Sequence, residues 1–592
     1  MQKTTYKRLK VVSYLFIIGL FFLIMRLMHI QLISPESFSK KDINLIEASV
    51  QQRTQALTVD EGRGRFVDRN NKPLTHDYYP TLILFPFLQK LDWPKDELAS
   101  ILQISETHLE EIVQELSAPV VVRDLGKPLK LTEEQMEKIN SLKYPGIIAM
   151  YRSFSLDKKA AEQLIGITGE NETEFLRRYK KRIENQYISP KTPIGVTGLE
   201  QAFDEFLLPE GSTQLLYHVD RYGGSLFGID VRYSAPSNPF YPLSIKTTID
   251  RDVQLIAEEI ANEYKINRGG ILLLDIETNE VLAMVSKPSI NWKDPFSDNG
   301  TKNVMVERHF PGSVFKTIIA AGAIEENLVS HNRMFDCNLD MYGESKDNKG
   351  LLDFEASFAQ SCNYTFAKLG QELENRHTGS IEGYSEKLGL LTEVVWQGDV
   401  FHFHEFHQLP QEETGMVMAE DNGDQYGKDI AQTSIGQREV KVTPIAVANM
   451  MATIARGGKA KQVKIVKELD YKNGTMLYSF PNHELSVDSV SKYTVMKLQH
   501  MLREVVEHEN GTGRRFQTLP YGVAGKSGTA QTGLKSSGGQ ELVHRWFAGY
   551  FPFENPKYSL VVVELDVVNE QSSVTSMYYD MVNKLYQYNE LQ

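Results

Sequence analysis

A serine and a lysine three residues apart stand in the stretch Phe310-Pro311-Gly312-Ser313-Val314-Phe315-Lys316-Thr317. Proline and glycine interrupt the preceding structure, and the small and apolar residues after Ser313 favour a helix. One helical turn puts the Ser313 hydroxyl and the Lys316 amine on the same face. A serine in the first turn also lies among unpaired backbone N–H groups at the positive end of the helix dipole. The stretch therefore suits a nucleophile whose attack generates an oxyanion.

This spacing alone is not specific, because Ser-x-x-Lys begins at four positions: Ser37, Ser155, Ser313 and Ser489. Among these, Ser313 follows Pro-Gly and precedes two further motifs. They are Ser361-Cys362-Asn363 and Gly525-Lys526-Ser527-Gly528-Thr529-Ala530, and the second has the small residues of a strand edge that a ligand can approach closely. Ser-x-x-Lys, Ser-x-Asn and Lys-Ser/Thr-Gly in this order resemble the signature of the penicillin-recognising serine acyltransferases.

The chemistry of such a set depends on a neutral lysine. A serine hydroxyl is a weak nucleophile until a base takes its proton. Lys316 is the nearest base, but an unperturbed lysine has a pKa near ~10.4 and is protonated at neutral pH. Burial and the neighbouring cation Lys526 both favour the neutral amine. We therefore expect a crowded, poorly solvated site around Lys316.

The composition is that of a globular protein. The chain has 592 residues, of which 41% are hydrophobic and 24% charged, and this length accommodates roughly three to four domains. The formal net charge of -13 argues against a dedicated nucleic-acid binder. Cys337 and Cys362 are the two cysteines, so we expect neither a disulfide framework nor a zinc cluster. We expect Cys362 to be a small packed residue without a redox role.

An apolar segment near the N-terminus predicts a membrane anchor. Four basic residues within the first ten positions precede an apolar run, Val11–Met25, that extends to Ile33 and approaches the ~20 residues needed to span a bilayer. No small-residue cleavage pattern follows, which favours an uncleaved signal-anchor; a buried core helix is the weaker alternative. The basic flank places the N-terminus in the cytoplasm and the catalytic part outside, as a single-pass protein of the cell membrane.

A Pro- and Ser-containing linker, Ser234–Pro239, separates two regions of the remaining chain. We predict a tail and anchor over residues 1–33, an elongated mixed α/β pedestal domain over 34–235 and a catalytic domain over 240–592. The last contains expected strands and helices at the following positions: strands 245–250, 270–276, 281–285, 546–551 and 560–565, and helices 252–264 and 577–588. An antiparallel sheet with helices before, between and after it is an α+β layered fold.

The chain resembles the class B penicillin-binding proteins, the monofunctional peptidoglycan D,D-transpeptidases, over nearly its whole length. Beyond the three motifs, the likeness is carried by short matches in both regions: Arg63-Gly64 with Asp68-Arg69-Asn70, Gly198-Leu199-Glu200, Thr248-Ile249-Asp250 with Gln254, Ser434-Ile435-Gly436-Gln437 with Thr443-Pro444, and Trp546-Phe547-Ala548-Gly549-Tyr550. Phe310 stands where many members have an acidic residue, and Cys362 and Ser527 are variant positions, but no reactive group is lost. The resemblance implies a serine β-lactamase-like transpeptidase domain on a dimerisation-like pedestal.

The resemblance also implies a role for each catalytic residue. Ser313 would attack the penultimate D-Ala carbonyl of a stem peptide, with Lys316 as its base. Ser361 would relay a proton to the leaving amine, and Asn363 would bind the substrate peptide and accept from Lys316. Lys526 would attract the terminal carboxylate of the substrate.

Further residues would bind the substrate around this centre. Ser527, Gly528, Thr529 and Gln437 would line the substrate site, and the backbone N–H groups of Ser313 and Thr529 would form the oxyanion hole. The cycle would release terminal D-Ala and cross-link a neighbouring strand, and β-lactams would acylate Ser313 by the same attack. No cofactor or metal is expected; the implied partners are stem peptides, the cytoplasmic membrane and a lipid-linked glycan polymerase.

Three other interpretations remain open from the sequence. A β-lactamase or penicillin sensor of the same fold would need a group that activates water for deacylation, which the sequence does not identify. A catalytically dispensable scaffold for cell-wall synthesis would have no need of the three motifs. Finally, His402, His404 and His407 alternate with phenylalanines, which fits either a metal site or a half-buried strand; we favour the strand.

Overall fold

The computed structural model describes residues 2–38, 44–46, 48, 54–124, 126–156, 159–184, 188–218, 232–236, 238–330, 332–340, 343–344, 348–417 and 426–591. The chain divides into two compact units. The first comprises Met1–Gly62, Tyr78–Phe154 and Gly211–Ser237, and the second comprises Arg63–Asp77, Ser155–Glu210 and Asn238–Gln592. The units thus interleave along the chain, whereas the sequence analysis placed consecutive ranges at 34–235 and 240–592. Ser237 of the predicted linker lies outside the described residues.

The N-terminal segment is helical. Helix α1 (Gln2–Met28) continues into a π-helical turn, η1 (His29–Ile33). Among the described residues, Tyr6–Ile33 is the one helix long and apolar enough to cross a membrane, and its side chains are exposed. This agrees with the predicted membrane anchor.

The first unit contains two three-stranded sheets, in the orders β1-β10-β11 and β4-β3-β7. Their strands are β1 (Thr54–Asp60), β10 (Thr213–His218), β11 (Arg232–Ser234), β3 (His76–Leu84), β4 (Val120–Val121) and β7 (Ile147–Ser155), with a small ribbon of β5 (Arg123–Asp124) and β6 (Lys127–Pro128). Its helices are α3 (Lys95–Leu102), α4 (Glu106–Gln114) and α5 (Glu133–Ser141). Thr132 begins α5 in a capping box with Gln135, which satisfies backbone donors at the helix start.

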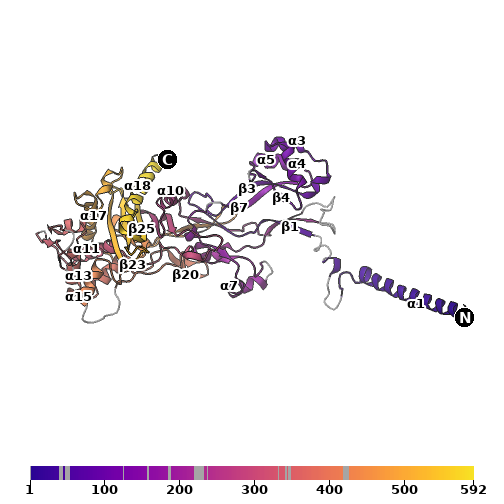
Figure 1. Ribbon diagram of the computed structural model, residues 1–592, viewed down its shortest axis with the longest axis horizontal. Coiled ribbons are helices and arrows are strands. Elements are labelled where there is room, and N and C mark those ends of the chain that lie inside the picture. Colours follow the sequence, from indigo (N-terminus) through magenta and orange to yellow (C-terminus); the bar gives the residue numbers. More distant parts are fainter. Residues whose placement is uncertain are drawn as a thin grey trace. The chain divides into compact units, whose positions relative to one another are not determined.

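A five-stranded antiparallel sheet forms the centre of the second unit, in the order β14-β13-β25-β24-β23. Figure 1 labels two of its strands, β23 and β25. Its strands are β13 (Gly269–Asp275), β14 (Val281–Lys287), β23 (Ala524–Lys535), β24 (Glu541–Phe551) and β25 (Tyr558–Val568). The predicted hairpin and late strands are confirmed, and β23, which carries the third motif, is an edge strand. The α+β fold class is likewise confirmed.

Helices cover both faces of this sheet. Along β25, Leu560 and Val562 pack with α10 (Arg251–Glu263) and α18 (Val574–Glu590), as expected when successive side chains alternate between faces. Val561 and Val563 belong to the opposite core with α11 (Lys316–Glu325) and α16 (Pro444–Ala455). Both faces of the sheet are thus covered, and the first half of the edge strand β23 is largely buried.

A second sheet joins segments that are distant in sequence. Its order is β2-β12-β21-β22, formed by β2 (Arg65–Val67), β12 (Ser244–Thr247), β21 (Val466–Asp470) and β22 (Met476–Ser479). Strand β12 pairs in parallel with β2, so the Arg63–Asp77 segment is part of the same unit as the C-terminal region.

The remaining elements of the second unit are further helices, 3-10 turns and short strands. They include α6 (Glu162–Ile165), β8 (Thr168–Gly169), α7 (Glu172–Glu184), β9 (Ile194–Gly195), α8 (Gly198–Ala202), α9 (Asp204–Leu207), η3 (Ser297–Asn299), η4 (Gly312–Phe315), β15 (Phe335–Asp336), β16 (Leu339–Asp340), β17 (Gly343–Glu344), β18 (Leu351–Leu352), α12 (Phe354–Ala359), α13 (Asn363–Arg376), α14 (Ser380–Lys387), β19 (Gln397–Val400), β20 (Phe403–His407), α15 (Tyr426–Ser434), α17 (Lys492–Glu507), η5 (Arg514–Thr518) and η6 (Asn569–Gln571).

Candidate active site

The turn that carries Ser313 is pressed against the edge strand β23. The predicted helix starts as the 3-10 turn η4, which runs directly into α11. Gly312 has φ 54° and donates its N–H to the Gly436 carbonyl at 3.0 Å. A Cβ on Gly312 would lie 2.3 Å from the Thr529 carbonyl oxygen. Glycine is therefore required here for both its backbone conformation and its lack of a side chain, and Ser313 follows it half-buried.

Lys316 is fully buried and connects the first two motifs. Its Nζ lies 2.6 Å from Asn363 Oδ1, 2.9 Å from the Ser361 carbonyl oxygen and 3.1 Å from Ser361 Oγ. Burial, together with the ammonium groups of Lys526 and Lys349, lowers the pKa of Lys316 well below its ordinary value. The poorly solvated site that the sequence predicts around this lysine is present.

The second motif occupies the turn between α12 and α13. Ser361 has φ 59°, a left-handed conformation that is uncommon for a residue with a side chain. Its N–H bonds the Phe358 carbonyl at 3.1 Å, and α13 begins at the exposed Asn363. This turn presents the Ser361 hydroxyl and the Asn363 amide to the same lysine.

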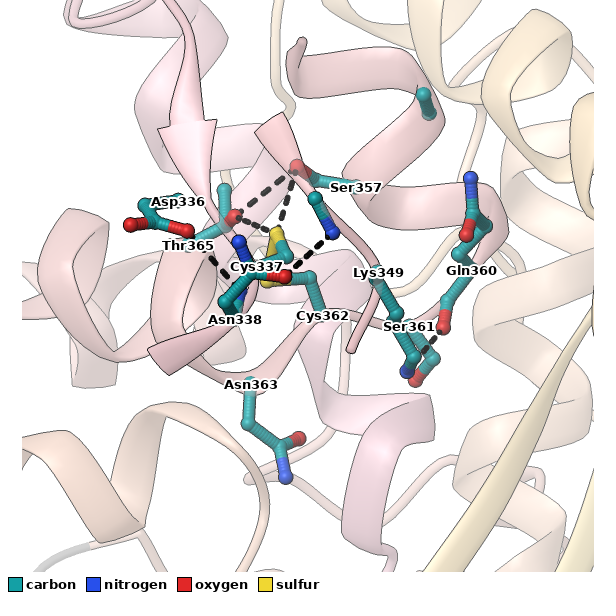
Figure 2. The surroundings of a disulfide bond; sticks show 12 residues. Asp336, Cys337, Asn338, Lys349, Ser357, Gln360, Ser361, Cys362, Asn363 and Thr365 are labelled. Atoms are coloured by element: carbon teal, nitrogen blue, oxygen red, sulfur yellow. Dashed lines mark hydrogen bonds between the residues drawn. A yellow bond between two sulfur atoms is a disulfide. The ribbon is translucent and has the colours of Figure 1, made fainter. Parts of the chain in front are cut away.

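The expectation of an unlinked Cys362 was wrong, because Cys362 forms a disulfide with Cys337 (Figure 2). The two are 25 positions apart in sequence. Strand β15 pairs with β18, and Cys337 donates its N–H to the Gly350 carbonyl at 2.8 Å, which brings Cys337 beside the start of α13. The pairing of two very short strands brings the two cysteines together, and no local sequence pattern predicts that pairing.

Lys349 is a third lysine at the site that sequence reasoning missed. It precedes Gly350, and its Nζ donates to the Gln360 carbonyl at 2.9 Å, next to Ser361 (Figure 2). We call residues 335–338 and 348–352, with the disulfide to Cys362, the disulfide clip. The clip holds Lys349 against the second motif, and this arrangement has no signature in sequence spacing.

The third motif lies on β23 with its lysine buried. Lys526 Nζ lies 3.3 Å from the Ser527 carbonyl oxygen and 5.5 Å from the centroid of the Phe358 ring. Burial and the charge of Lys349 lower the pKa of Lys526 to about 7. The Ser527 hydroxyl donates to Thr512 Oγ1 at 2.8 Å, so the turn around Thr512 borders the site.

The two glycines on either side of the nucleophile turn permit close packing. A Cβ on Gly528 would lie 2.5 Å from the Pro311 carbonyl oxygen, and one on Gly436 would lie 2.1 Å from the Gly312 carbonyl oxygen. Gln437 follows Gly436 and is half-buried. Thr529 receives a hydrogen bond on Oγ1 from Arg545 Nη1. The structure thus gathers the residues predicted from all three motifs, and Gln437, around η4.

The histidines of the β19–β20 hairpin lie apart from this site, each next to a different carboxylate. The pairs are His402 with Glu205 at 3.6 Å, His404 with Asp399 at 3.6 Å and His407 with Glu393 at 2.9 Å. Within the described ranges, no group of three or more histidine, cysteine or acidic side chains is placed to hold a metal ion.

These features define the class of protein: an antiparallel sheet between helical layers carries Lys-Ser-Gly on its edge strand, and the other two motifs meet at one buried lysine, as in the penicillin-recognising transpeptidases. Two family models agree. The penicillin-binding protein transpeptidase domain matches residues 269–582, and the penicillin-binding protein dimerisation domain matches residues 58–231. The first match covers more than half of the chain, and the chain therefore belongs to the penicillin-binding protein transpeptidase family.

Relatives extend over both regions of the chain. The chain is 23% identical over 561 residues to the peptidoglycan D,D-transpeptidase MrdA of Haemophilus influenzae, covering 86% of this chain and 82% of that protein. It is 25% identical over 575 residues to the peptidoglycan D,D-transpeptidase FtsI of Escherichia coli, covering 92% and 85%. It is 26% identical over 537 residues to the stage V sporulation protein D of Bacillus subtilis, covering 86% and 74%. The resemblance to class B penicillin-binding proteins is confirmed.

The fold is also that of a solved structure. A chain of a peptidoglycan synthase complex, described as coordinating polymerization and crosslinking, superposes with a TM-score of 0.60 at 20% identity and covers 97% of both chains. At this identity the likeness establishes the fold.

Proposed function

We propose that this protein is a peptidoglycan D,D-transpeptidase that works through an acyl-enzyme on Ser313. The observation that carries the proposal is the buried amine of Lys316, one helical turn after Ser313. Its pKa is lowered, and it contacts both Ser361 and Asn363. A lowered pKa favours the neutral amine, which is the form that can take a proton from a serine hydroxyl. Family membership and relatives named peptidoglycan D,D-transpeptidases support the same reaction.

In the proposed cycle, Lys316 takes the Ser313 proton while Oγ bonds to the carbonyl carbon of the penultimate D-Ala. The carbonyl oxygen becomes an oxyanion, which accepts hydrogen bonds from the Ser313 and Thr529 N–H groups. Collapse of this intermediate breaks the peptide bond, and the leaving D-Ala amine takes its proton from Lys316 through Ser361. An amine of a neighbouring strand then attacks the ester carbon while Lys316 takes its proton. The bond from that carbon to Ser313 Oγ breaks, and Oγ recovers the proton from Lys316. Water in place of the amine gives carboxypeptidation.

The third motif would bind the other end of the donor substrate. Lys526 supplies positive charge for the terminal carboxylate, and Ser527 and Thr529 supply hydroxyl contacts on the same strand. Gly528 and Gln437 line the substrate site without adding charge. A β-lactam presents a comparable carbonyl and carboxylate, so it would acylate Ser313 and remain bound if deacylation is slow.

We also propose a membrane orientation and a partner. The α1 segment would anchor the chain in the cell membrane with the basic N-terminus in the cytoplasm and the catalytic part outside. The Cys337–Cys362 disulfide supports this orientation, because disulfides persist in oxidising compartments. The fold shared with a chain of a complex that coordinates polymerization and crosslinking supports a lipid-linked glycan polymerase as the partner. Within residues 34–235, the part in the first unit would serve as the pedestal. Residues 240–592 would carry the catalytic residues, in one unit with Arg63–Asp77 and Ser155–Glu210.

Labelling with a fluorescent penicillin tests the proposal. The full chain and its Ser313→Ala variant are incubated with the reagent and resolved on a denaturing gel. Stable labelling of the natural chain that is lost in the variant supports an acyl-enzyme on Ser313. Transient labelling with destruction of the antibiotic would indicate a β-lactamase, and labelling of neither form would favour a scaffold.

A further inference from the structure

Arg545 is a charged residue beside the third motif to which no role has been given so far. It lies on β24 directly opposite Thr529 of β23 in the antiparallel register, so the two side chains share one face of the sheet. Its Nη1 donates to Thr529 Oγ1 and, at 3.1 Å, to Asn569 Oδ1. The guanidinium therefore contacts a hydroxyl that the proposed function assigns to the substrate carboxylate.

The charge of Arg545 is not neutralised by an ion pair. In the part of the chain that the structure describes, no carboxylate lies within ion-pairing distance of its guanidinium. Glu564 stands opposite Arg545 on β25, but Glu564 Oε2 accepts the Ser573 N–H at 2.9 Å. The Arg545 Nε is buried and has no hydrogen-bond partner among the described residues. Glu564 attracts the guanidinium electrostatically, but no carboxylate bonds to it directly. A half-buried guanidinium with a spare donor and no bonded anion is stabilised when an anion completes its surroundings.

The hydrogen bond from Arg545 also determines what the Thr529 hydroxyl can do. A hydroxyl has one donor and two acceptor positions, whereas a guanidinium only donates. The Thr529 oxygen therefore accepts from Arg545, and its own proton cannot be directed back at that partner. The proton is left to donate elsewhere, and an ionised carboxylate, which only accepts, is the complementary group.

The pairing between β24 and β25 is irregular beside Arg545. The register of β24 against β25 shifts between Val543 and Arg545, and Asp566 on β25 has φ 53°. A bulge of this kind re-aims neighbouring side chains and is frequent beside active sites. The irregularity lies next to Arg545, at the position where β24 pairs with the third motif.

We propose that Arg545 is a positioning residue for the carboxylate of the donor substrate, and this inference rests on the proposed transpeptidase function. It orients the Thr529 hydroxyl as a donor toward that carboxylate and adds a lasting positive charge behind it. Lys526 provides the other charge, but burial and Lys349 bring its pKa to about 7. Arginine keeps its proton throughout this range. The site would therefore continue to attract carboxylates at pH values where Lys526 is neutral.

The test compares a penicillin that has a free carboxylate with the methyl ester of the same penicillin, using the full chain. For Arg545→Gln, the acylation rate constant k2/K for the free acid should fall by about ten- to a hundredfold, the range of a hydrogen bond to a charged group. The loss should appear in K, with k2 retained, because the contact exists before and during the reaction. Acylation by the ester should be unchanged. Arg545→Lys, which keeps the charge, should restore part of the preference for the acid.

The ratio of k2/K for the free acid to k2/K for the ester, measured as a function of pH, separates this role from a structural one. Changes in Lys316 affect both forms equally and cancel in the ratio. In Arg545→Gln the ratio should fall as the pH rises through about 7, where Lys526 loses its proton, while in the natural chain it should persist. The groups that face these cations are the same in both proteins: Lys316 and Lys349 beside Lys526, and Glu564 beside Arg545.

Arg515→Gln is the matched control, because Arg515 also donates to a hydroxyl, Ser576 Oγ at 3.0 Å, outside the site. It should leave the ratio unchanged. An equal fall for acid and ester, or an unchanged ratio in Arg545→Gln, would overturn the inference while leaving the transpeptidase proposal intact. If the natural chain is acylated by neither form at Ser313, both proposals fail.

Discussion

Three lysines share one small volume of the proposed active site, and their mutual repulsion is part of its chemistry. Lys316 and Lys526 are fully buried, so each loses hydration when it is charged. The charge of Lys349 adds to this effect for both of them. The lowered pKa of Lys316 is thus the joint result of burial, of the Lys526 charge and of the Lys349 charge that the disulfide clip holds nearby.

We predict that Lys349→Gln moves the acid limb of the pH–acylation profile to higher pH. Removing the Lys349 charge raises the pKa of Lys316, because one of the interactions that disfavours its protonated form is lost. The base is active when neutral, so acylation below the limb becomes slower and the alkaline plateau is retained. The measurement is k2/K for a β-lactam as a function of pH.

Lys368→Gln serves as the control for this prediction. Lys368 is an exposed lysine on α13, just after the second motif, and it is not among the charges that shift Lys316. Its removal should leave the profile in place. A Lys349→Gln profile that coincides with that of the natural chain would show that Lys349 does not tune the base.

Sequence reasoning predicts the residues of the candidate site whose proximity local geometry determines. Ser313 and Lys316 are one turn apart on a helix, and Lys526 to Thr529 follow one another along a strand, so their proximity follows from periodicity. Lys349 and Arg545 reach the site through strand pairings between separate segments, which spacing does not encode. Cys337 was missed for the same reason.

At the scale of elements, the site depends on the close approach of the η4 turn and strand β23. We predict that Gly312→Ala lowers the acylation rate constant by on the order of a hundredfold, the cost of displacing a nucleophile by about 1 Å. The new Cβ would lie 2.3 Å from the Thr529 carbonyl oxygen, and φ 54° is unfavourable for alanine. Acylation is measured with a chromogenic β-lactam, alongside thermal unfolding.

Gly383→Ala gives the matched comparison for Gly312→Ala. Gly383 lies in helix α14, and a Cβ there meets nothing within 4 Å. This variant should be acylated at the natural rate and should be slightly more stable, because alanine favours helices over glycine. Equal activity of the two variants would contradict the close packing described for η4.

The disulfide clip is the second element on which the site relies. Its bond closes a loop across 25 positions, and such a cross-link stabilises the folded state by about 3 kcal/mol in the chain-entropy account. We predict that Cys337→Ala lowers the free energy of unfolding by this amount and abolishes its dependence on reductant. Chemical unfolding with and without a reducing agent provides the measurement. A natural chain whose stability does not respond to reduction would rule the cross-link out as a stabilising element.

The large elements were more predictable than their connections. The hairpin β13–β14, the late strands β24 and β25 and the helix α18 were foreseen, since their alternating or helical apolar patterns match burial on one or two faces. The short strands β15 and β18 carry too few residues for such a pattern. Their pairing depends on the surrounding core, and the position of Lys349 depends on that pairing.

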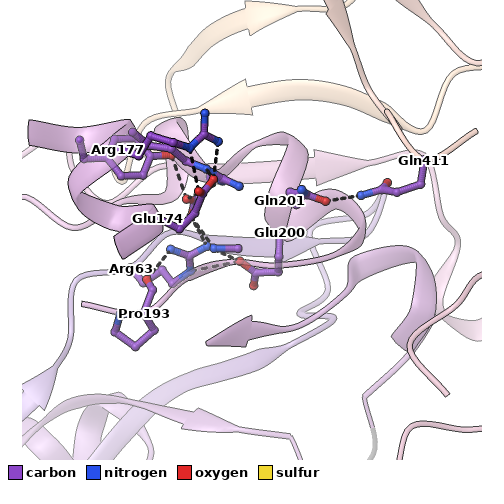
Figure 3. Close-up of polar contacts among 11 residues, drawn as sticks. Arg63, Glu174, Arg177, Pro193, Glu200, Gln201 and Gln411 are labelled. Atoms are coloured by element: carbon purple, nitrogen blue, oxygen red, sulfur yellow. Dashed lines mark hydrogen bonds and ion pairs between the residues drawn. The ribbon is translucent and has the colours of Figure 1, made fainter. Parts of the chain in front are cut away.

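At the scale of the whole molecule, segments from the N-terminal region are built into the second unit. Arg63 Nη2 lies 2.5 Å from Glu200 Oε2 (Figure 3). The same nitrogen lies 2.9 Å from Asp204 Oδ1. Gln411 Nε2 donates to Gln201 Oε1 at 2.5 Å and so ties α8 to the C-terminal region. The motif residues Arg63 and Glu200 thus have a structural role as a nearly buried ion pair. Removal of Arg63 would leave the buried charge of Glu200 without its partner.

Apolar packing reinforces these polar contacts. Phe66 of β2 and Phe203, which follows α8, are fully buried in the same core as α11 and α16. The Phe203 ring packs edge-on against Phe406 at 5.0 Å between centroids. Each buried aromatic of this kind stabilises a fold by about 3–5 kcal/mol relative to alanine. Removal of the N-terminal segments would therefore expose part of the core that supports Lys316.

We predict that a fragment of residues 240–592 does not fold, although it contains all three motifs, whereas residues 54–592 fold and are labelled by a fluorescent penicillin. The shorter fragment lacks Phe66, Phe203 and the strand that pairs with β12. At about 3–5 kcal/mol for each buried aromatic, this loss is comparable with the roughly 5–15 kcal/mol that stabilises a typical domain. The longer fragment loses residues 1–53, which include the anchor segment, and keeps Phe66, Phe203 and β2. Thermal unfolding monitored by circular dichroism, together with gel labelling, compares the two. If residues 240–592 unfold cooperatively and are labelled as well as 54–592, then the N-terminal segments are accessory and the motif region is an independent domain.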